Sequence, residues 1–217
     1  RKHPLAWMSV VGLAVFIMPV IRWLLGRPYM ISGTVWMILL VLWRPGAILK
    51  TKHIIFSSLL IAAAGWMHGA WYLFALFPLS VLLTLDLHKT WKAAVAWGTG
   101  SLLAGFITGN PIHYLFFQIL QSLESTENTP VNRLLVGEFQ PRFHFLPLII
   151  FLSAALWLLI QKQKKDSVLI HPAFWGAVIG WVLGLMNGRF WYDWGSVATM
   201  VWVAEVFSST SLPRVPI

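Results

Sequence analysis

Long apolar runs separated by short polar connections dominate the chain. The runs are continuous rather than alternating, which favours helices over a barrel, and a spanning helix needs about 20 mostly apolar residues. The pattern therefore predicts an all-α fold, a polytopic transmembrane helix bundle of about eight spans. We place these spans at residues 5–25, 28–43, 54–67, 70–86, 91–108, 145–161, 168–187 and 195–208.

The apolar stretch 54–85 has two interpretations. It forms either one long span with an interfacial piece, or two helices that turn at "GWMHG", residues 65–69. With the turn, one side of the membrane receives eleven of the sixteen basic residues, including every lysine. Because cytoplasmic loops of membrane proteins collect Lys and Arg, we favour the turn. We expect an integral membrane protein of a bacterial or archaeal cytoplasmic membrane, with the Lys-rich loops cytoplasmic.

The segment 109–145 is the largest piece expected on the opposite side. In "GNPIHYLFFQILQSL" the apolar residues recur at helical spacing, and Pro111 suits a first helical turn. Such a helix lies in the interface plane rather than across the membrane. We therefore expect one transmembrane domain over residues 1–217, with an external interfacial helix and loop at 109–145.

Composition agrees with a membrane location and excludes some chemistry. The hydrophobic fraction is 58% and the charged fraction 11%, whereas soluble domains carry about 25% charged residues. We read the net charge of +9 as a topology signal and expect no nucleic-acid partner. The absence of cysteine excludes disulfides and thiolate metal sites. Many of the 14 tryptophans, such as Trp43, Trp66, Trp91 and Trp191, end apolar runs and suggest an interfacial belt.

Four polar clusters fall in different connections on the side away from the lysines. If these connections meet, one cleft holds carboxylates, cations and aromatic faces. Each cluster also has a structural interpretation: a turn residue, a helix start, an exposed ion pair, or an ion pair within a tight turn. No soluble-enzyme motif or metal-ligand cluster appears, and we predict no cofactor. The candidate substrate-binding residues are His68, Asn110, Glu138, Gln140, Arg142, Arg189, Tyr192 and Asp193.

Several of these stretches resemble motifs of the GT-C-type polytopic membrane glycosyltransferases, in order along nearly the whole chain. "LLGRPYMIS" resembles their "RP…S" stretch, and "WMHGAWYLFALFPL" their "LHG" segment. "GNPIHYLFFQIL" is similar to their "NP" interfacial helix, and "VGEFQPRF" to their "EFQP" motif. "GRFWYDWGSVATMVW" occupies the place of their last span, although "FWYDWG" replaces a more apolar sequence.

The resemblance implies transfer of a sugar from a polyprenyl-phosphate donor to an acceptor outside the cytoplasm. The family uses an acidic residue in its first external loop as base or metal ligand, but the first loop here is only "GRP". Either a catalytic loop, with a divalent metal, lies upstream of Arg1, or the chain is non-catalytic. We therefore assign no catalytic residue.

The alternatives are a non-catalytic integral-membrane subunit that scaffolds a larger complex, and a transporter. Few ionisable residues lie within the apolar runs, which disfavours a transport pathway. The expected partners are membrane lipids, a polyprenyl-phosphate sugar donor and other membrane subunits.

Overall fold

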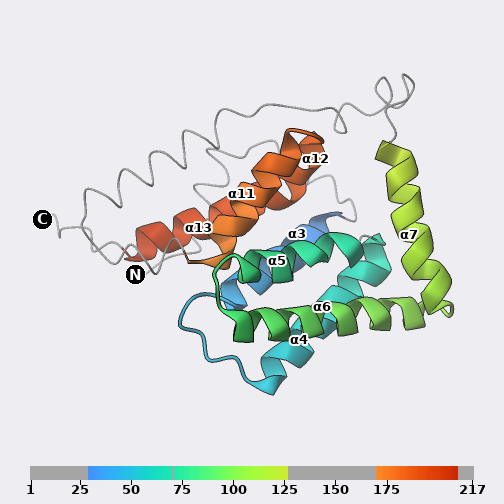
Figure 1. Cartoon of the computed structure of the whole chain (residues 1–217), viewed down its shortest axis with the longest axis horizontal. Coiled ribbons are helices and arrows are strands. Elements are labelled where there is room, and N and C mark those ends of the chain that lie inside the picture. The colour runs from blue at the N-terminus through green and yellow to red at the C-terminus, as the bar shows by residue number, and fades with distance from the viewer. Residues whose placement is uncertain (1–28, 70, 127–169, 210–217) are drawn as a thin grey trace, which may run out of the picture.

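The computed structural model describes residues 29–69, 71–126 and 170–209, and every regular element in these ranges is helical (Figure 1). The all-α prediction is confirmed for this part of the chain. The elements are α3 (Tyr29–Leu42), α4 (Thr51–His68), η1 (Trp71–Ala75), α5 (Leu76–Leu82), α6 (Leu87–Ile107), α7 (Pro111–Thr126), α11 (Pro172–Gly184), α12 (Gly188–Phe190), η3 (Trp191–Gly195) and α13 (Ser196–Ser209).

The predicted polytopic transmembrane bundle of about eight spans is wrong. Within residues 29–69, 71–126 and 170–209, none of the helices combines the length and the apolar character needed to cross a membrane. α3 has 14 residues and α11 has 13, whereas a span needs about 20. α6 has 21 residues, but its sequence includes Lys89 and Lys92 together with several small polar residues. The predicted spans 5–25 and 145–161 lie outside the described residues.

The core is built around buried tryptophans. Trp36 is fully buried, donates from Nε1 to the carbonyl of Trp194 at 3.1 Å, and meets the Trp194 ring edge-on at 5.4 Å. Trp43 donates from Nε1 to the Ser57 hydroxyl at 3.0 Å. A buried indole N–H needs such an acceptor, so these contacts fix how α3 packs on its neighbours.

The interpretation of the tryptophans as an interfacial belt needs correction. Trp43 and Trp191 are buried, whereas Trp66 and Trp91 are exposed. The end of an apolar run therefore does not decide whether its tryptophan faces the core, because partners from distant elements decide it.

α4 and α6 pack closely and run in the same direction (Figure 1). A Cβ at Gly100 would lie 2.6 Å from the Ser58 carbonyl, and a Cβ at Gly65 would lie 3.1 Å from that of Ala104. The sequence numbers therefore rise together along the contact. Consequently the first turns of α4 and α6 share one end of the pair, and His68 lies toward the other.

α11 and η3 also approach at glycines. A Cβ at Gly180 would lie 2.4 Å from the Gly195 Cα, a distance that backbone atoms cannot relieve by rotamer change. η3 is a π-helical segment in which Ser196 N–H bonds the Trp191 carbonyl. Such segments are rare and occur frequently at functional sites. The close approach fixes the turn that carries Arg189 and Asp193.

Candidate functional site

α4 ends at His68 in a left-handed cap. Gly69 has a φ of 71° and its N–H donates to the Gly65 carbonyl at 2.7 Å. Glycine adopts this conformation without the steric cost of a side chain. The predicted break of the 54–85 stretch is thereby confirmed, with His68 in the last turn before it.

The second part of the site is the turn that starts at Asn187. The Asn187 Oδ1 accepts from the Arg189 N–H at 3.1 Å and so caps α12. Arg189 Nε donates to Asp193 Oδ2 at 3.1 Å, across one helical turn. The Asp193 side chain is 5% exposed to solvent, and the Arg189 side chain is 30% exposed. The guanidinium therefore neutralises a buried carboxylate while still reaching the surface.

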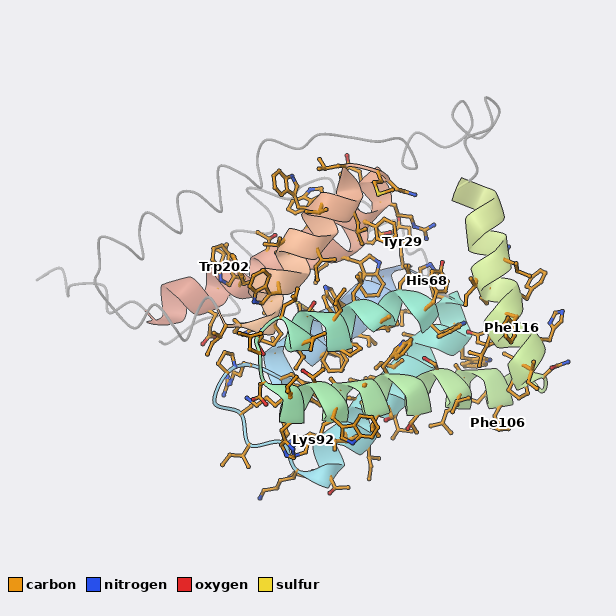
Figure 2. All side chains as sticks on the ribbon, in the orientation of Figure 1. Tyr29, His68, Lys92, Phe106, Phe116 and Trp202 are labelled. Atoms are coloured by element: carbon orange, nitrogen blue, oxygen red, sulfur yellow. The ribbon has the colours of Figure 1, made fainter. Side chains whose placement is uncertain are left out.

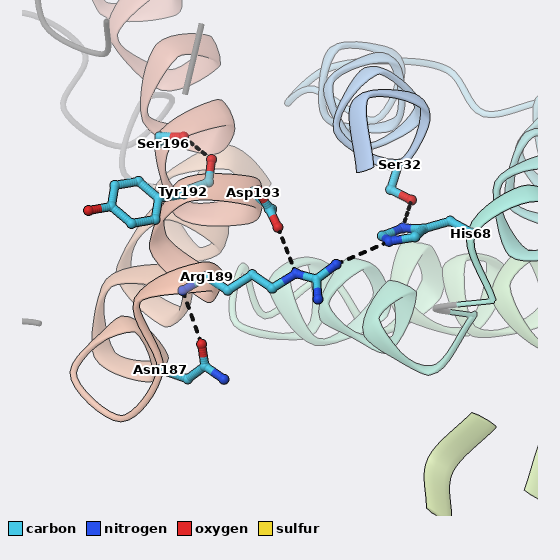
Figure 3. Close-up of polar contacts among 7 residues, drawn as sticks. All are labelled: Ser32, His68, Asn187, Arg189, Tyr192, Asp193 and Ser196. Atoms are coloured by element: carbon cyan, nitrogen blue, oxygen red, sulfur yellow. Dashed lines mark hydrogen bonds and ion pairs between the residues drawn. The ribbon is translucent and has the colours of Figure 1, made fainter. Parts of the chain in front are cut away.

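His68 joins this ion pair to α3. Arg189 Nη2 lies 3.2 Å from His68 Nε2, and the Ser32 hydroxyl lies 2.7 Å from His68 Nδ1 (Figure 3). We call Ser32, His68, Arg189 and Asp193 the polar cluster. Its members come from α3, α4, α12 and η3, so the hydrogen-bonded chain exists only in the folded protein.

The contacts define the protonation state of His68. A guanidinium can only donate, so Nε2 must accept and the proton lies on Nδ1, which donates to Ser32. Burial first, and the charge of Arg189 second, lower the pKa of His68 to about 4. The imidazole is therefore neutral at physiological pH, and its basic nitrogen is occupied by Arg189. The cluster is suited to binding rather than to proton abstraction through His68.

α7 braces the cluster end of the molecule. The Tyr114 hydroxyl donates to the Gly65 carbonyl, and a Cβ at Gly69 would lie 2.6 Å from Gln118 Oε1. The outer face of α7 exposes Ile112, Phe116 and Leu120, and Figure 2 shows Phe116 pointing outward. The helix expected from Pro111 is thus present, while its location relative to a membrane stays a prediction.

The other candidate residues have different positions. Asn110 is exposed, and its Oδ1 accepts from His113 N–H at 3.2 Å, so it starts α7 as its structural interpretation proposed. Figure 3 shows the Tyr192 ring directed away from His68, although Tyr192 is next to Asp193 in the sequence. The candidates Glu138, Gln140 and Arg142 lie outside the described residues.

Ser32 is the cluster member that our sequence interpretation did not select. A hydroxyl within an apolar run carries no chemical signature, and its only signal was its place at the end of "RPYMIS". For metal chemistry, residues 29–69, 71–126 and 170–209 contain no group of three or more His, Cys, Asp or Glu placed to hold an ion.

Comparison of the chain with protein-family models, curated proteins and solved structures found no match. The resemblance to the GT-C glycosyltransferases therefore stays a prediction. The case for a function rests on the contacts of the polar cluster.

Proposed function

We propose that this chain handles a polyprenyl-phosphate-linked sugar, as the GT-C-type glycosyltransferases do, and that Arg189 contacts the phosphate. One observation carries the proposal. Ser32, His68 and Arg189 come from three stretches that resemble the family's motifs, and they form one hydrogen-bonded chain in the folded protein. Ser32 is 36 residues from His68, and Arg189 is 121 residues from it, so the contacts join three distant segments, unlike an ion pair between neighbouring surface residues.

The chemistry of Arg189 suits a phosphate. A guanidinium offers five N–H donors in a plane that matches phosphate oxygens. Asp193 and His68 hold Nε and Nη2, so the side chain loses little rotamer freedom when a ligand binds. In this proposal, Glu138 accepts hydrogen bonds from the sugar hydroxyls or acts as the base.

We propose a membrane location for this activity, with the Lys-rich loops on the cytoplasmic side. A polyprenyl chain is insoluble in water and must reach the protein from lipid. The outer faces of the helices carry large exposed apolar side chains, including Phe56, Leu59, Phe106 and Ile107. Such surfaces are typical of lipid or protein contact.

A second candidate is a non-catalytic membrane subunit that binds the lipid carrier within a larger complex. The observation that favours it is the occupied Nε2 of His68, which leaves the cluster able to bind an anion but unable to accept a proton there. Both candidates require phosphate recognition by Arg189, and they differ only in whether sugar transfer follows.

Binding of polyprenyl phosphate to the full chain tests the proposal. We expect wild-type protein to prefer polyprenyl phosphate over the matching uncharged polyprenol. Arg189→Gln should weaken binding by about tenfold to a hundredfold, the range for a lost charge-assisted hydrogen bond. Arg189→Lys should retain part of the affinity, because the charge stays but the planar fork is lost.

The matched control is Arg44→Gln, which removes the other arginine of the described chain, near His171. Arg44 lies beyond the end of α3 that is opposite to Ser32, so its loss should reduce phosphate discrimination much less than Arg189→Gln does. Equal affinity for polyprenol and polyprenyl phosphate, or an unchanged affinity in a folded Arg189→Gln variant, would contradict the proposed role. Sugar transfer by the same preparation would separate an enzyme from a binding subunit.

A further inference from the structure

The opposite end of the α4–α6 pair carries a second distinctive surface. Lys92 Nζ donates to the Leu49 carbonyl at 3.3 Å, which ties the α3–α4 connection to the first turns of α6. We call residues 43–52 and 83–92 the lysine end. Figure 2 labels Lys92 at this end and His68 at the other.

Positive charge is concentrated at the lysine end. Of the six lysines and arginines in the described part of the chain, five lie in residues 43–52 and 83–92. The same residues include one carboxylate, Asp86, whose Oδ2 lies 3.5 Å from Lys89 Nζ. This surface therefore keeps a large excess of positive charge. The five cations are Arg44, Lys50, Lys52, Lys89 and Lys92.

Large apolar side chains project from the same surface. Leu85 is 86% exposed, Ile48 80%, Leu87 72% and Trp91 70%. Residues this apolar are normally at least partly covered, and a group of them marks an interaction site. They lie in the same two segments as the lysines, so a partner must accept cations and apolar groups at once.

Leu85 adopts a backbone conformation that disfavours it. Its φ is 62°, in the left-handed region, and it is the one non-glycine residue with a positive φ among the described residues. A leucine at such a position is strained, and this kind of strain concentrates at functional sites. Hydrogen bonds from Leu85 N–H to the Leu82 carbonyl and from the Thr84 hydroxyl to the Val81 carbonyl close the turn. The turn holds the side chain outward.

We propose that the lysine end binds the surface of an anionic phospholipid leaflet. Leu85, Leu87, Trp91 and Ile48 enter the headgroup region, and the lysines bind lipid phosphates. Lipid fits better than nucleic acid, because a duplex surface offers no apolar phase for these side chains. Binding of this kind needs no spanning helix. The inference involves no member of the polar cluster, so it does not depend on phosphate recognition by Arg189.

The cysteine-free chain allows a direct test. Leu85→Cys provides a single attachment site for an environment-sensitive fluorophore, and Leu87→Cys provides a second one. The labelled full chain is mixed with phosphatidylcholine vesicles that contain nitroxide lipids. We expect the nitroxides to quench the label more strongly as the fraction of phosphatidylglycerol in the vesicles is raised. Added salt should reverse the increase, because surface charges are screened.

Lys50→Gln with Lys52→Gln should shift the phosphatidylglycerol titration by about fivefold per lysine removed. The matched control is Thr51→Gln, which changes an exposed neutral side chain between them and should leave the titration unchanged. Three results would overturn the proposal. The label could be quenched equally in neutral and anionic vesicles, or aqueous iodide could reach the label equally in both. The label could also respond to duplex DNA, and anionic lipid could fail to displace that DNA. Arg189 variants that lose phosphate discrimination should still show the same increase in quenching with phosphatidylglycerol.

Discussion

The two ends of the α4–α6 pair hold their cations in different ways. At the polar cluster, Arg189 is fixed by Asp193 and by His68, and the acidic partner is buried. At the lysine end, Lys50 and Lys52 are exposed among apolar side chains. Arg189 contacts His68, from a segment distant in sequence, as well as the nearby Asp193, whereas the lysines lie at the starts of α4 and α6.

This difference separates two kinds of anion recognition. A cation held by two partners has one position and suits one phosphate. Several exposed lysines suit a surface whose charges are spread out and mobile, as lipid headgroups are. The same residue chemistry therefore supports a ligand site at one end and a docking surface at the other.

The largest predicted loss of stability comes from a variant that disturbs the polar cluster and leaves the lysine end in place. In Gly180→Ala the new Cβ would lie 2.4 Å from Gly195 Cα, and we expect unfolding free energy to fall by about 3 kcal/mol. η3 would move, and phosphate discrimination would fall with it, while the label at residue 85 should respond as before. Chemical denaturation and ligand binding measure the two effects.

The control for that variant is Gly98→Ala, because a Cβ at Gly98 meets no atom within 4 Å. Replacing a helical glycine by alanine should raise the unfolding free energy by up to about 1 kcal/mol. If the two alanine variants have the same stability, the tight contact between α11 and η3 does not hold the site.

The ion pairs of the two ends should differ in their contribution to stability. Asp193→Asn removes the buried negative charge that faces Arg189, and we expect a loss of unfolding free energy of about 2 kcal/mol, after allowance for the exposed part of Arg189. Asp86→Asn removes the partly exposed pair with Lys89 but keeps an oxygen that can cap α6. That change should cost less than about 1 kcal/mol. Equal losses in a denaturation series would refute the distinction.

Acidification should weaken the folded state through His68 and His171. The pKa of each is lowered from 6.5 to about 4, mainly by burial, and at His171 also by Arg44. Between these values the unfolded chain binds more protons, so stability is full above pH 6.5 and falls as the pH drops toward 4. Denaturation at a series of pH values measures this decrease.

His68→Gln and His171→Asn sharpen the pH prediction. Glutamine can still accept from Arg189, and asparagine can still accept from the Ala173 N–H that His171 Nδ1 now bonds. Neither replacement titrates in this range, so each should remove part of the pH dependence. A pH profile identical to that of the wild-type protein in both variants would show that neither histidine is held neutral by burial.

The smallest predicted effect is at Leu85. Leu85→Gly relieves the left-handed backbone strain and loses little burial, so stability should rise by less than about 1 kcal/mol. The comparison variant Leu102→Gly lies within α6 and should lose about 1 kcal/mol or more. A loss of stability in Leu85→Gly as large as that in Leu102→Gly would indicate that the Leu85 side chain serves the fold.

Local sequence patterns predicted where the helices lie better than they predicted whether those helices cross a membrane. The apolar run 28–43 becomes α3 (Tyr29–Leu42), and the break expected at residues 65–69 occurs after His68. Periodicity and glycine act locally, which explains this agreement. The transmembrane interpretation was wrong because run length overestimated helix length: residues 70–86 contain η1 and α5, and α5 has only 7 residues.

The site was only partly predictable for the same reason. His68, Arg189 and Asp193 were selected as polar residues in apolar surroundings, and the fold brings them together. Ser32 and the π-helical turn of η3 left no comparable signal, because both depend on packing between distant segments. The substrate-binding role of the selected residues stays a prediction.

The most direct test of the central claim is the side-chain NMR signal of Arg189 Nε in isotope-labelled protein, assigned by its loss in Arg189→Lys. We predict that polyprenyl phosphate shifts this signal in a saturable way and that the matching polyprenol does not. A signal that polyprenyl phosphate leaves unchanged at saturation would contradict the claim, and the polar cluster would then be a structural link between α3, α4 and η3.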